Sequence, residues 1–274
     1  MCSPYSRLLT TCQPGKATYP APALHLPFVS MEEHRVVPRA FEEEVGRGRT
    51  VAKSLHYCSL AATWPLCVGR VKRVVAMSDL HGATTIAVNR LIRRGIIDDE
   101  TIVLCTGDMT GNGRMGADGD PYDDYVRLRD AARALYLVQG NHDRESQAVL
   151  TMCNSDGRPC CVHRRAVSTP LGRITGVSGI MAGDGSQGAG GQADPTLHKY
   201  PADIYMRWVR QAAALRPDVL LTHMPLNATA QQEAIRSVPI HLFGHAHVDE
   251  GYASVPEWGQ GLRLNMDSRI FVFE

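Results

Sequence analysis

Residues 71–108 read VKRVVAMSDLHGATTIAVNRLIRRGIIDDETIVLCTGD, and this stretch decides the fold class. It begins with a short apolar run rich in valine, which predicts a buried strand ending at Asp79. Residues 84–95 carry apolar side chains at helical spacing, and a second apolar run at 101–105 leads to Asp108. The order strand, helix, strand predicts two parallel strands joined by a right-handed crossover.

The pattern of short apolar runs and helical segments continues to the C-terminus. We expect helices over 122–135 and 204–215, a hairpin over 166–177, and strands over 136–138, 219–221, 240–243, 262–265 and 270–273. In sheets of parallel strands, polar residues just past the strand ends gather at one edge, where ligands bind. The residues that follow these strands are therefore the first candidates for a functional site.

The composition is that of an ordinary globular chain. The 274 residues include 29 basic and 28 acidic side chains, for a formal net charge of +1, and 44% are hydrophobic. These values exclude a disordered or collagen-like chain and a strongly basic protein that coats nucleic acid. No run approaches the roughly 18 apolar residues that span a bilayer. We therefore expect no strong interaction with nucleic acid or membrane.

Five polar clusters stand at the ends of five of the expected strands. They are Asp79-Leu80-His81, Gly107-Asp108 with Gly113, Gly140-Asn141-His142-Asp143, Thr222-His223 and Gly244-His245-Ala246-His247. An Asp-x-His triplet alone carries little weight, whereas Gly-Asn-His-Asp is expected by chance in roughly one chain in a thousand of this composition. The ordered set, with each cluster closing a strand, is not accidental.

The residue types in these clusters suit a pair of divalent metal ions. Carboxylates and neutral imidazoles ligate Mn, Fe, Zn or Co, and the clusters contain no cysteine that would favour a thiolate site. One carboxylate can give an oxygen to each of two metals, so the lone Asp108 is a natural bridge. Two metals about 3.5–4 Å apart bind phosphoryl oxygens and polarise a shared water. We expect two ions here, with manganese favoured.

The clusters resemble the signature of the calcineurin-like metallophosphoesterase superfamily: D-x-H, G-D-x4-G, G-N-H-[DE], a lone His and G-H-x-H. The resemblance covers residues 71 to about 250. It implies a mixed α/β (α+β) fold in which a two-sheet β-sandwich is flanked by helices, an αββα arrangement. It also implies that the first metal is held by Asp79, His81, Asp108 and His247. The second would share Asp108 and be completed by Asn141, His223 and His245.

The resemblance also implies a chemistry. His142 would be the catalytic histidine beside the phosphate, with Asp143 as its partner, and metal-bound hydroxide would attack phosphorus in line. The sequence thus predicts a metal-dependent phosphoester hydrolase, first a phosphodiesterase for a small or nucleotide-like substrate. A phosphomonoesterase, including a protein phosphatase, is the alternative, and a non-catalytic scaffold is a third. Loops 109–120 and 181–200 are expected to select the substrate, and the oligomeric state is open.

Single residues have simpler interpretations. Asp79 or Asp108 alone suits a helix N-cap, and Gly140-Asn141 alone suits a turn. Arg144 fits a phosphate clamp or an exposed helix start equally well. Six of the eleven histidines lie outside the clusters, and we expect structural or surface duty for them: His25, His34, His56, His163, His198 and His241.

Residues 1–70 precede the regular part of the chain. Residues 1–31 contain no Asp or Glu and five prolines, which indicates a disordered tail more than an organelle targeting segment. The apolar stretch 55–68 is expected to pack on the core. We therefore divide the chain into an N-terminal extension, 1–70, and a catalytic domain, 71–274. Eight cysteines without a CxxC pair favour a reduced, cytoplasmic setting.

Overall fold

The computed structural model describes a large part of the chain, from the first of its N-terminal strands to the last strand before the C-terminus. Residues described with their side chains are 71–81, 84–110, 120–183, 193–245, 262–266 and 270–273, and further strands are described by their backbone at 28–35, 41–44, 50–53, 56–62 and 253–254. Residues 1–27 of the expected tail, His247, and residues 111–119 and 184–192 of the two substrate loops lie outside this part. The end of the expected tail, residues 28–31, instead begins a strand, Phe28–Arg35.

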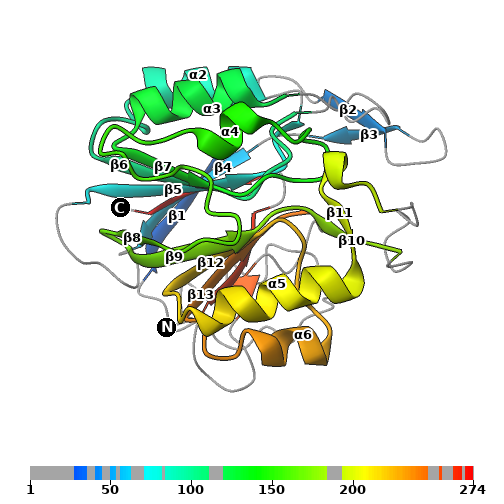
Figure 1. Cartoon of the computed structure of the whole chain (residues 1–274). Coiled ribbons are helices and arrows are strands. Elements are labelled where there is room, and N and C mark those ends of the chain that lie inside the picture. Colours follow the sequence, from blue (N-terminus) through cyan, green and yellow to red (C-terminus); the bar gives the residue numbers. More distant parts are fainter. Residues whose placement is uncertain are drawn as a thin grey trace, which may run out of the picture.

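Two sheets face each other at the centre of the molecule (Figure 1). The first has the strand order β1 (Phe28–Arg35), β4 (His56–Ala62), β16 (Arg269–Phe273), β5 (Arg73–Ser78), β6 (Thr101–Cys105), β7 (Ala134–Leu137). The second has the order β14 (Ala253–Ser254), β15 (Leu262–Asn265), β13 (Ile240–Phe243), β12 (Val219–Thr222), β9 (Gly172–Val177), β8 (Val167–Thr169).

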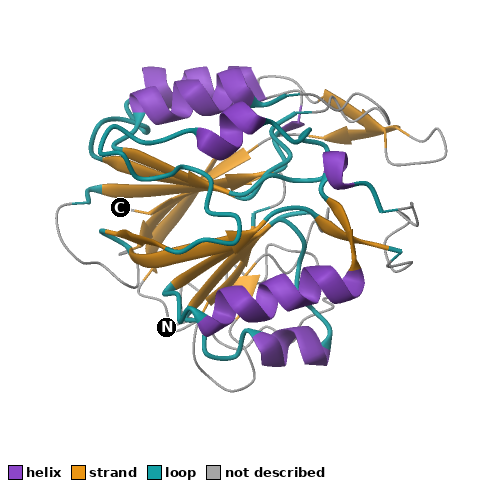
Figure 2. Ribbon diagram, viewed as in Figure 1, coloured by secondary structure: helices purple, strands orange, loops and turns teal. Residues whose placement is uncertain are grey.

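Helices cover the outer face of each sheet, as the secondary-structure colouring makes plain (Figure 2). Over the first sheet lie α2 (Thr84–Arg93), α3 (Tyr122–Ala131) and α4 (Gln147–Thr151). Over the second lie α5 (Ala202–Ala214) and α6 (Thr229–Ala234). The expected αββα sandwich is therefore confirmed. Within the described residues, none of the helices has the length and apolar character that a membrane crossing requires.

The parallel pairing expected from the sequence is present, but it is divided between the two sheets. Strands β5, β6 and β7 are parallel to one another, and so are β9, β12, β13 and β15. Residues 160–164 run between the two sets, with parallel bridges from Cys161 to Leu137 and from His163 to Gly176. The carboxyl ends of both sets therefore meet at one edge of the sandwich, which is where the polar clusters lie.

The N-terminal strands extend the first sheet. β4 pairs in parallel with β16, and β1 pairs antiparallel with β4. Part of the sequence before residue 70 is thus hydrogen-bonded to the last strand of the chain, and the domain boundary at residue 70 stays a prediction. Two small pairs lie beside the main sheets: β2 (Phe41–Glu44) is antiparallel to β3 (Thr50–Lys53), and β10 (Ile180–Ala182) is parallel to β11 (Lys199–Pro201).

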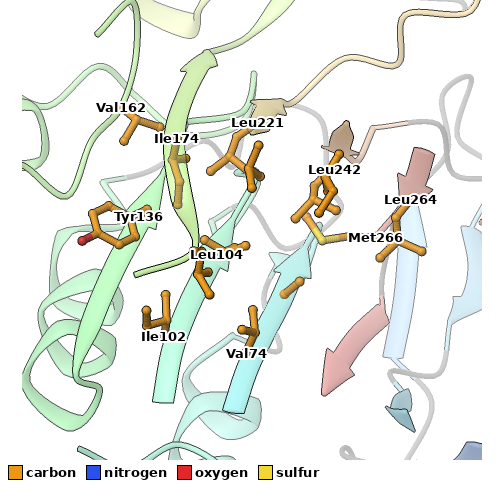
Figure 3. Close-up of a cluster of buried hydrophobic side chains, with 14 of the residues drawn as sticks. Val74, Ile102, Leu104, Tyr136, Val162, Ile174, Leu221, Leu242, Leu264 and Met266 are labelled. Carbon is orange, nitrogen blue, oxygen red and sulfur yellow. The ribbon is translucent and has the colours of Figure 1, made fainter. Parts of the chain in front are cut away.

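Side chains alternate between the sandwich core and the helix layers with the period of a strand. On β6, Ile102 and Leu104 enter the core between the sheets, whereas Val103 and Cys105 pack under the helices. Figure 3 shows the inner set converging from both sheets, with Leu221 and Leu242 of the second sheet facing residues of the first. The distance between the two sheets is therefore fixed by close-packed apolar side chains.

The boundary between α3 and β7 differs from the prediction. We expected a helix to Leu135 and a strand from Tyr136, but α3 ends at Ala131 and β7 begins at Ala134. Ala132 is extended, and the N–H of Arg133 donates to Thr101 O at 2.9 Å, so the chain has already joined the sheet. No glycine or proline marks this transition, and periodicity alone did not locate it.

Leu104→Ala tests the packing between the sheets. The Leu104 side chain is fully buried in the sandwich core, so its truncation should lower the free energy of unfolding by about 2 to 5 kcal/mol. Ile86→Ala is the control, because the Ile86 side chain is 52% exposed and should change stability by less than about 0.5 kcal/mol. Denaturant unfolding followed by circular dichroism measures both; equal effects would contradict the proposed core.

Candidate metal centre

The candidate ligands come from five loops at the shared edge of the two sheets. Asp79, Asp108 and Asn141 follow β5, β6 and β7 of the first sheet, and His223 and His245 follow β12 and β13 of the second. Hydrogen bonds link neighbouring loops: the N–H of Asp79 donates to Gly107 O at 3.0 Å, and the N–H of His245 donates to the Asp79 carboxylate at 3.0 Å. Residues far apart in the chain are thereby held at one edge.

Two groups of ligand atoms lie close enough to hold ions. In each group the atoms lie within 4.8 Å of one another, and the groups consist of Asp79, His81 and Asp108, and of Asp108, His223 and His245. Asp108 is common to both. Asn141 belongs beside the second group, since its Oδ1 lies 3.0 Å from His223 Nε2. The structure thus brings together six of the seven expected ligands, and the seventh, His247, lies outside the described residues.

Hydrogen bonds orient the ligand histidines. His223 Nδ1 lies 2.8 Å from the carbonyl of Thr106, and His81 Nδ1 lies 3.2 Å from the carbonyl of Thr110. A carbonyl only accepts, so each ring is assigned a proton on Nδ1, which leaves Nε2 as the atom that can bind a metal when the ring is neutral. A backbone partner of this kind fixes the tautomer of metal-binding histidines. Both rings therefore present Nε2 as the ligand atom.

Several candidate ligands have a strained backbone. Asp79, His81, Asp108 and His245 have φ values of 55°, 45°, 51° and 62°. This left-handed region costs an L-residue about 1–2 kcal/mol, and such strain persists only where the surroundings enforce it. This conformation turns the backbone sharply just after the strands that precede these residues.

Glycines allow the loops to approach one another. A Cβ atom on Gly140 would lie 2.0 Å from Asp108 Oδ1, and one on Gly244 would lie 2.1 Å from Asp79 Oδ2. Gly107 has a φ of 98°, and a Cβ there would lie 2.1 Å from the nitrogen of Gly140. The three glycines of the sequence clusters are therefore required because carboxylates and backbone pass within contact distance of them.

Asp108 and His223 form a buried charged pair in the protein without metal. His223 Nε2 lies 3.2 Å from Asp108 Oδ2, and neither side chain is exposed. Burial alone raises the pKa of Asp108, but the neighbouring His223, His142 and His81 hold it well below its usual range. Burial lowers the pKa of His223, and Asp108 raises it to about 9. Because metal binds the neutral imidazole, an entering ion must displace this proton.

Asp143 holds the backbone of two of the ligand loops. Its carboxylate accepts hydrogen bonds at 2.9–3.4 Å from the N–H groups of Asp108, Met109, Thr110 and Gly140 and from the hydroxyls of Thr110 and Tyr125. Burial and the nearby Asp108 carboxylate raise the pKa of Asp143. These contacts give Asp143 a positioning role toward Asp108, and its partnership with the ring of His142 stays a prediction.

His142 lies at the rim of the two groups. Its N–H donates to Asp108 Oδ1 at 2.8 Å, and its ring meets His81 edge-on with centroids 5.3 Å apart. Unlike Asp79 and Asp108, it is only half-buried. Arg144, the alternative phosphate clamp, is exposed, and its carbonyl accepts from Gln139 Nε2 at 3.0 Å.

Two supporting residues were missed in the sequence. The hydroxyl of Ser78 donates to Asp79 Oδ2 at 2.5 Å, and that of Thr110 donates to Asp143 Oδ1 at 2.9 Å. Ser78 directly precedes Asp79, so a search for hydroxyls flanking each carboxylate would have found it. Thr110 is recognisable only once the loop after β6 is seen to fold over Asp143.

The residues present fit divalent metal ions. Carboxylate oxygen, imidazole nitrogen and an amide oxygen converge, and the groups contain no thiolate. Asp108 Oδ2 is buried and lies 3.2 Å from His223 Nε2, so in the protein without metal it faces a protonated imidazole whose proton a cation can replace. A buried carboxylate of this kind is costly unless a positive charge compensates it. The site can therefore hold two ions that share Asp108.

Comparisons with known proteins bear on the same region. A family profile described as calcineurin-like phosphoesterase matches residues 72–249, which include every candidate ligand. Among solved structures, the chain is similar to a phosphopantetheinyl hydrolase from Mycobacterium tuberculosis, with 16% identity over 72% of this chain and 90% of that one. The TM-score is 0.42. No curated protein matches the chain.

Gly140→Ala tests the approach of the ligand loops. The added methyl would occupy the position of Asp108 Oδ1, so metal affinity should fall by about 10- to 100-fold. Gly157→Ala is the control: its φ of 80° makes the backbone more strained than that of Gly140, but nothing lies within 4 Å of the added Cβ. Titration calorimetry with Mn²⁺ measures the affinity, and circular dichroism checks folding. Unchanged affinity in Gly140→Ala would refute the assignment of Asp108 as a ligand.

Proposed function

The chain belongs to the calcineurin-like phosphoesterase family and is a metal-dependent phosphoester hydrolase, and from this premise we propose that its substrates are phosphodiesters of small or nucleotide-like molecules. The observation that carries the proposal is the shared Asp108, which is common to both ligand groups and whose position is fixed by Asp143 and Gly140. A site for two ions bridged by one carboxylate is suited to phosphoryl chemistry.

The preference for a diester rests on the sequence around Asp108. The second cluster reads GDMTGNG over residues 107–113. The protein phosphatases of the superfamily usually carry an Asp-Arg-Gly ending at this place, and this chain does not. The formal net charge of +1 and the absence of a long basic track argue for a small substrate over a nucleic-acid backbone.

The described residues have separate roles in the proposed reaction. Asp79, His81 and Asp108 would hold one ion, and Asp108, Asn141, His223 and His245 the other. This mixture of oxygen and nitrogen donors suits Mn, Fe, Zn or Co, and manganese is the ion that we propose. When bound, two such ions activate a water molecule and offset charge on the phosphoryl oxygens. His142, half-buried at the rim, is placed to give a proton to the leaving oxygen.

The backbone holds His142 in register with the bridging carboxylate. Its N–H is bonded to Asp108 Oδ1 and its carbonyl accepts the hydroxyl of Thr110, so the residue cannot move independently of the ligand loops. Positioning of this kind contributes to catalysis because the reacting groups need not be ordered during the reaction.

Two chromogenic esters distinguish the candidate activities. With Mn²⁺, the protein should hydrolyse bis-p-nitrophenyl phosphate faster than p-nitrophenyl phosphate, and a chelator should abolish both reactions. A faster reaction with the monoester would replace the diesterase by a phosphomonoesterase. If the metal-loaded protein turned over neither ester, a binding scaffold would be favoured instead.

His142→Ala and Asp108→Asn separate proton transfer from metal binding. Removal of the His142 ring should lower kcat by about 10²- to 10⁴-fold while two ions remain bound. Asp108→Asn should lose activity and metal together, because Asp108 belongs to both groups. Elemental analysis of the purified variants gives the metal content. Full activity of Asp108→Asn would show that the bridging role is wrong.

A further inference from the structure

His198 occupies a place that the sequence did not assign to the site. It directly follows the short helix η3 (Pro195–Leu197) and precedes β11. We expected structural or surface duty for it, but the structure buries it to 2% exposure. Its φ of 51° is in the left-handed region, as it is for four of the candidate ligands. Such strain in a buried histidine indicates that its position is enforced by its surroundings.

Backbone contacts attach His198 to the edge of the second sheet. The N–H of Ile180 donates to His198 O at 2.9 Å, and a Cβ on Gly179 would lie 1.9 Å from the same oxygen. Gly179 follows the end of β9, whose residue Val177 is paired with Thr222 of β12. His223 is the next residue after Thr222. His198 therefore packs on the strand end that adjoins the loop of a candidate ligand.

A second set of contacts attaches the same segment to the loop after β7. The N–H of Glu145 donates to Thr196 O at 2.9 Å, and the N–H of Gly179 donates to Gln139 O at 2.8 Å. Residues 139–145 contain Asn141 and His142. His198 is thus held between the two loops that supply Asn141 and His223, of which His223 belongs to the second ligand group and Asn141 lies beside it.

One ring nitrogen of His198 has a hydrogen-bond partner among the described residues, and the other has none. Nδ1 lies 3.0 Å from the hydroxyl of Tyr200, whereas Nε2 is buried and has no hydrogen-bond partner among the described residues. A buried polar atom left unsatisfied is costly, so it points to a ligand or water that completes it. Tyr200 is itself packed edge-on against Trp208 with centroids 4.7 Å apart, which holds the phenol in place.

A neutral His198 ring carries one proton, which Nε2 can donate. Burial and the nearby His223 lower the pKa of His198 to about 4, with Asp108 opposing, so the ring is neutral at pH 7. His223 and Asp108, the two groups that shift the pKa of His198 besides burial, are thus both members of the second ligand group. Burial raises the pKa of Tyr200 to about 12, so the phenol keeps its proton. A phenol that donates to Nδ1 leaves the single ring proton on Nε2.

We propose that His198 is a further substrate-contacting residue, whose Nε2–H donates a hydrogen bond to an oxygen of the bound phosphoryl group beside Asn141 and His223. In this arrangement the Tyr200 hydroxyl donates to Nδ1, which leaves the ring proton on Nε2. The inference rests on the proposed function, because it names the group that holds the phosphoryl oxygen at the same site. A neutral donor suits this place, since it binds an anion without competing for the cations.

Two substitutions at His198 differ in whether they keep a hydrogen-bond donor at the position of Nε2. The amide of Gln reaches the position of Nε2 and keeps a donor there, whereas the amide of Asn overlaps Nδ1 and leaves the Nε2 position empty. The probe is inorganic phosphate, titrated calorimetrically into the Mn²⁺-loaded full-length protein. His198→Asn should weaken phosphate binding by about 10-fold or more, and His198→Gln should restore most of the loss.

If His198 had only a structural role, backbone strain would rank the two variants in the opposite order. Asn tolerates the left-handed conformation better than Gln, so a purely structural role would make His198→Gln the poorer variant. His241→Asn is the control for burial. His241 on β13 is also fully buried, with Nδ1 unpartnered among the described residues, and burial and then Arg263 lower its pKa. This control should bind phosphate as the unaltered protein does.

Three results would overturn the inference: unchanged phosphate affinity in His198→Asn, equal losses in His198→Asn and His198→Gln, or loss of Mn²⁺ from His198→Asn, which would make His198 a metal ligand. The measurement does not depend on turnover. Failure of the proposed function is seen separately, as absence of ester hydrolysis by the metal-loaded protein, and leaves the comparison of phosphate affinities intact.

Discussion

The position of the Asp108 carboxylate is the constraint on which the rest of the site depends. Oδ1 accepts the N–H of His142, and Oδ2 lies 3.2 Å from His223 Nε2, so one side chain joins the loop after β7 to the second sheet. The approach is possible only because Gly140 has no Cβ. The buried Asp143 carboxylate accepts hydrogen bonds from the backbone N–H groups of Asp108 and Met109 and so holds the main chain there. The metal ligands are therefore arranged by hydrogen bonds of the protein itself.

This arrangement is maintained at a cost to the backbone. Asp79, His81, Asp108 and His245 each adopt a conformation that costs about 1–2 kcal/mol relative to the usual one. Hydrogen bonds to the same loops offset that cost, because each satisfies a buried donor or acceptor that would otherwise be unpaired. The strain lies where side chains must leave the ends of strands sharply. It is consistent with a site that is formed before an ion or a substrate arrives.

The sequence predicted the parts of the structure that local pattern determines. Strands β6, β13 and β15 have the expected bounds because each apolar run is delimited by polar or turn residues. The boundary between α3 and β7 was misplaced because nothing delimits it. His198 was missed for a different reason: its contacts join residues 139, 145 and 179–180 to 196–198, and no spacing in the sequence records such pairs. The roles of the candidate ligands remain predictions until metal is measured.

The sandwich core also determines the geometry of the site. Asp79, Asp108 and Asn141 extend from the first sheet, whereas His223 and His245 extend from the second. The N–H of His245 reaches the Asp79 carboxylate across 166 residues of chain. Ligand distances across this edge are thus set by the thickness of the apolar layer that contains Leu104, Leu221 and Leu242. Close-packed interiors transmit small displacements. A change in that layer should therefore alter the second ligand group, which spans both sheets, before it alters Asp79 and His81, which extend from one.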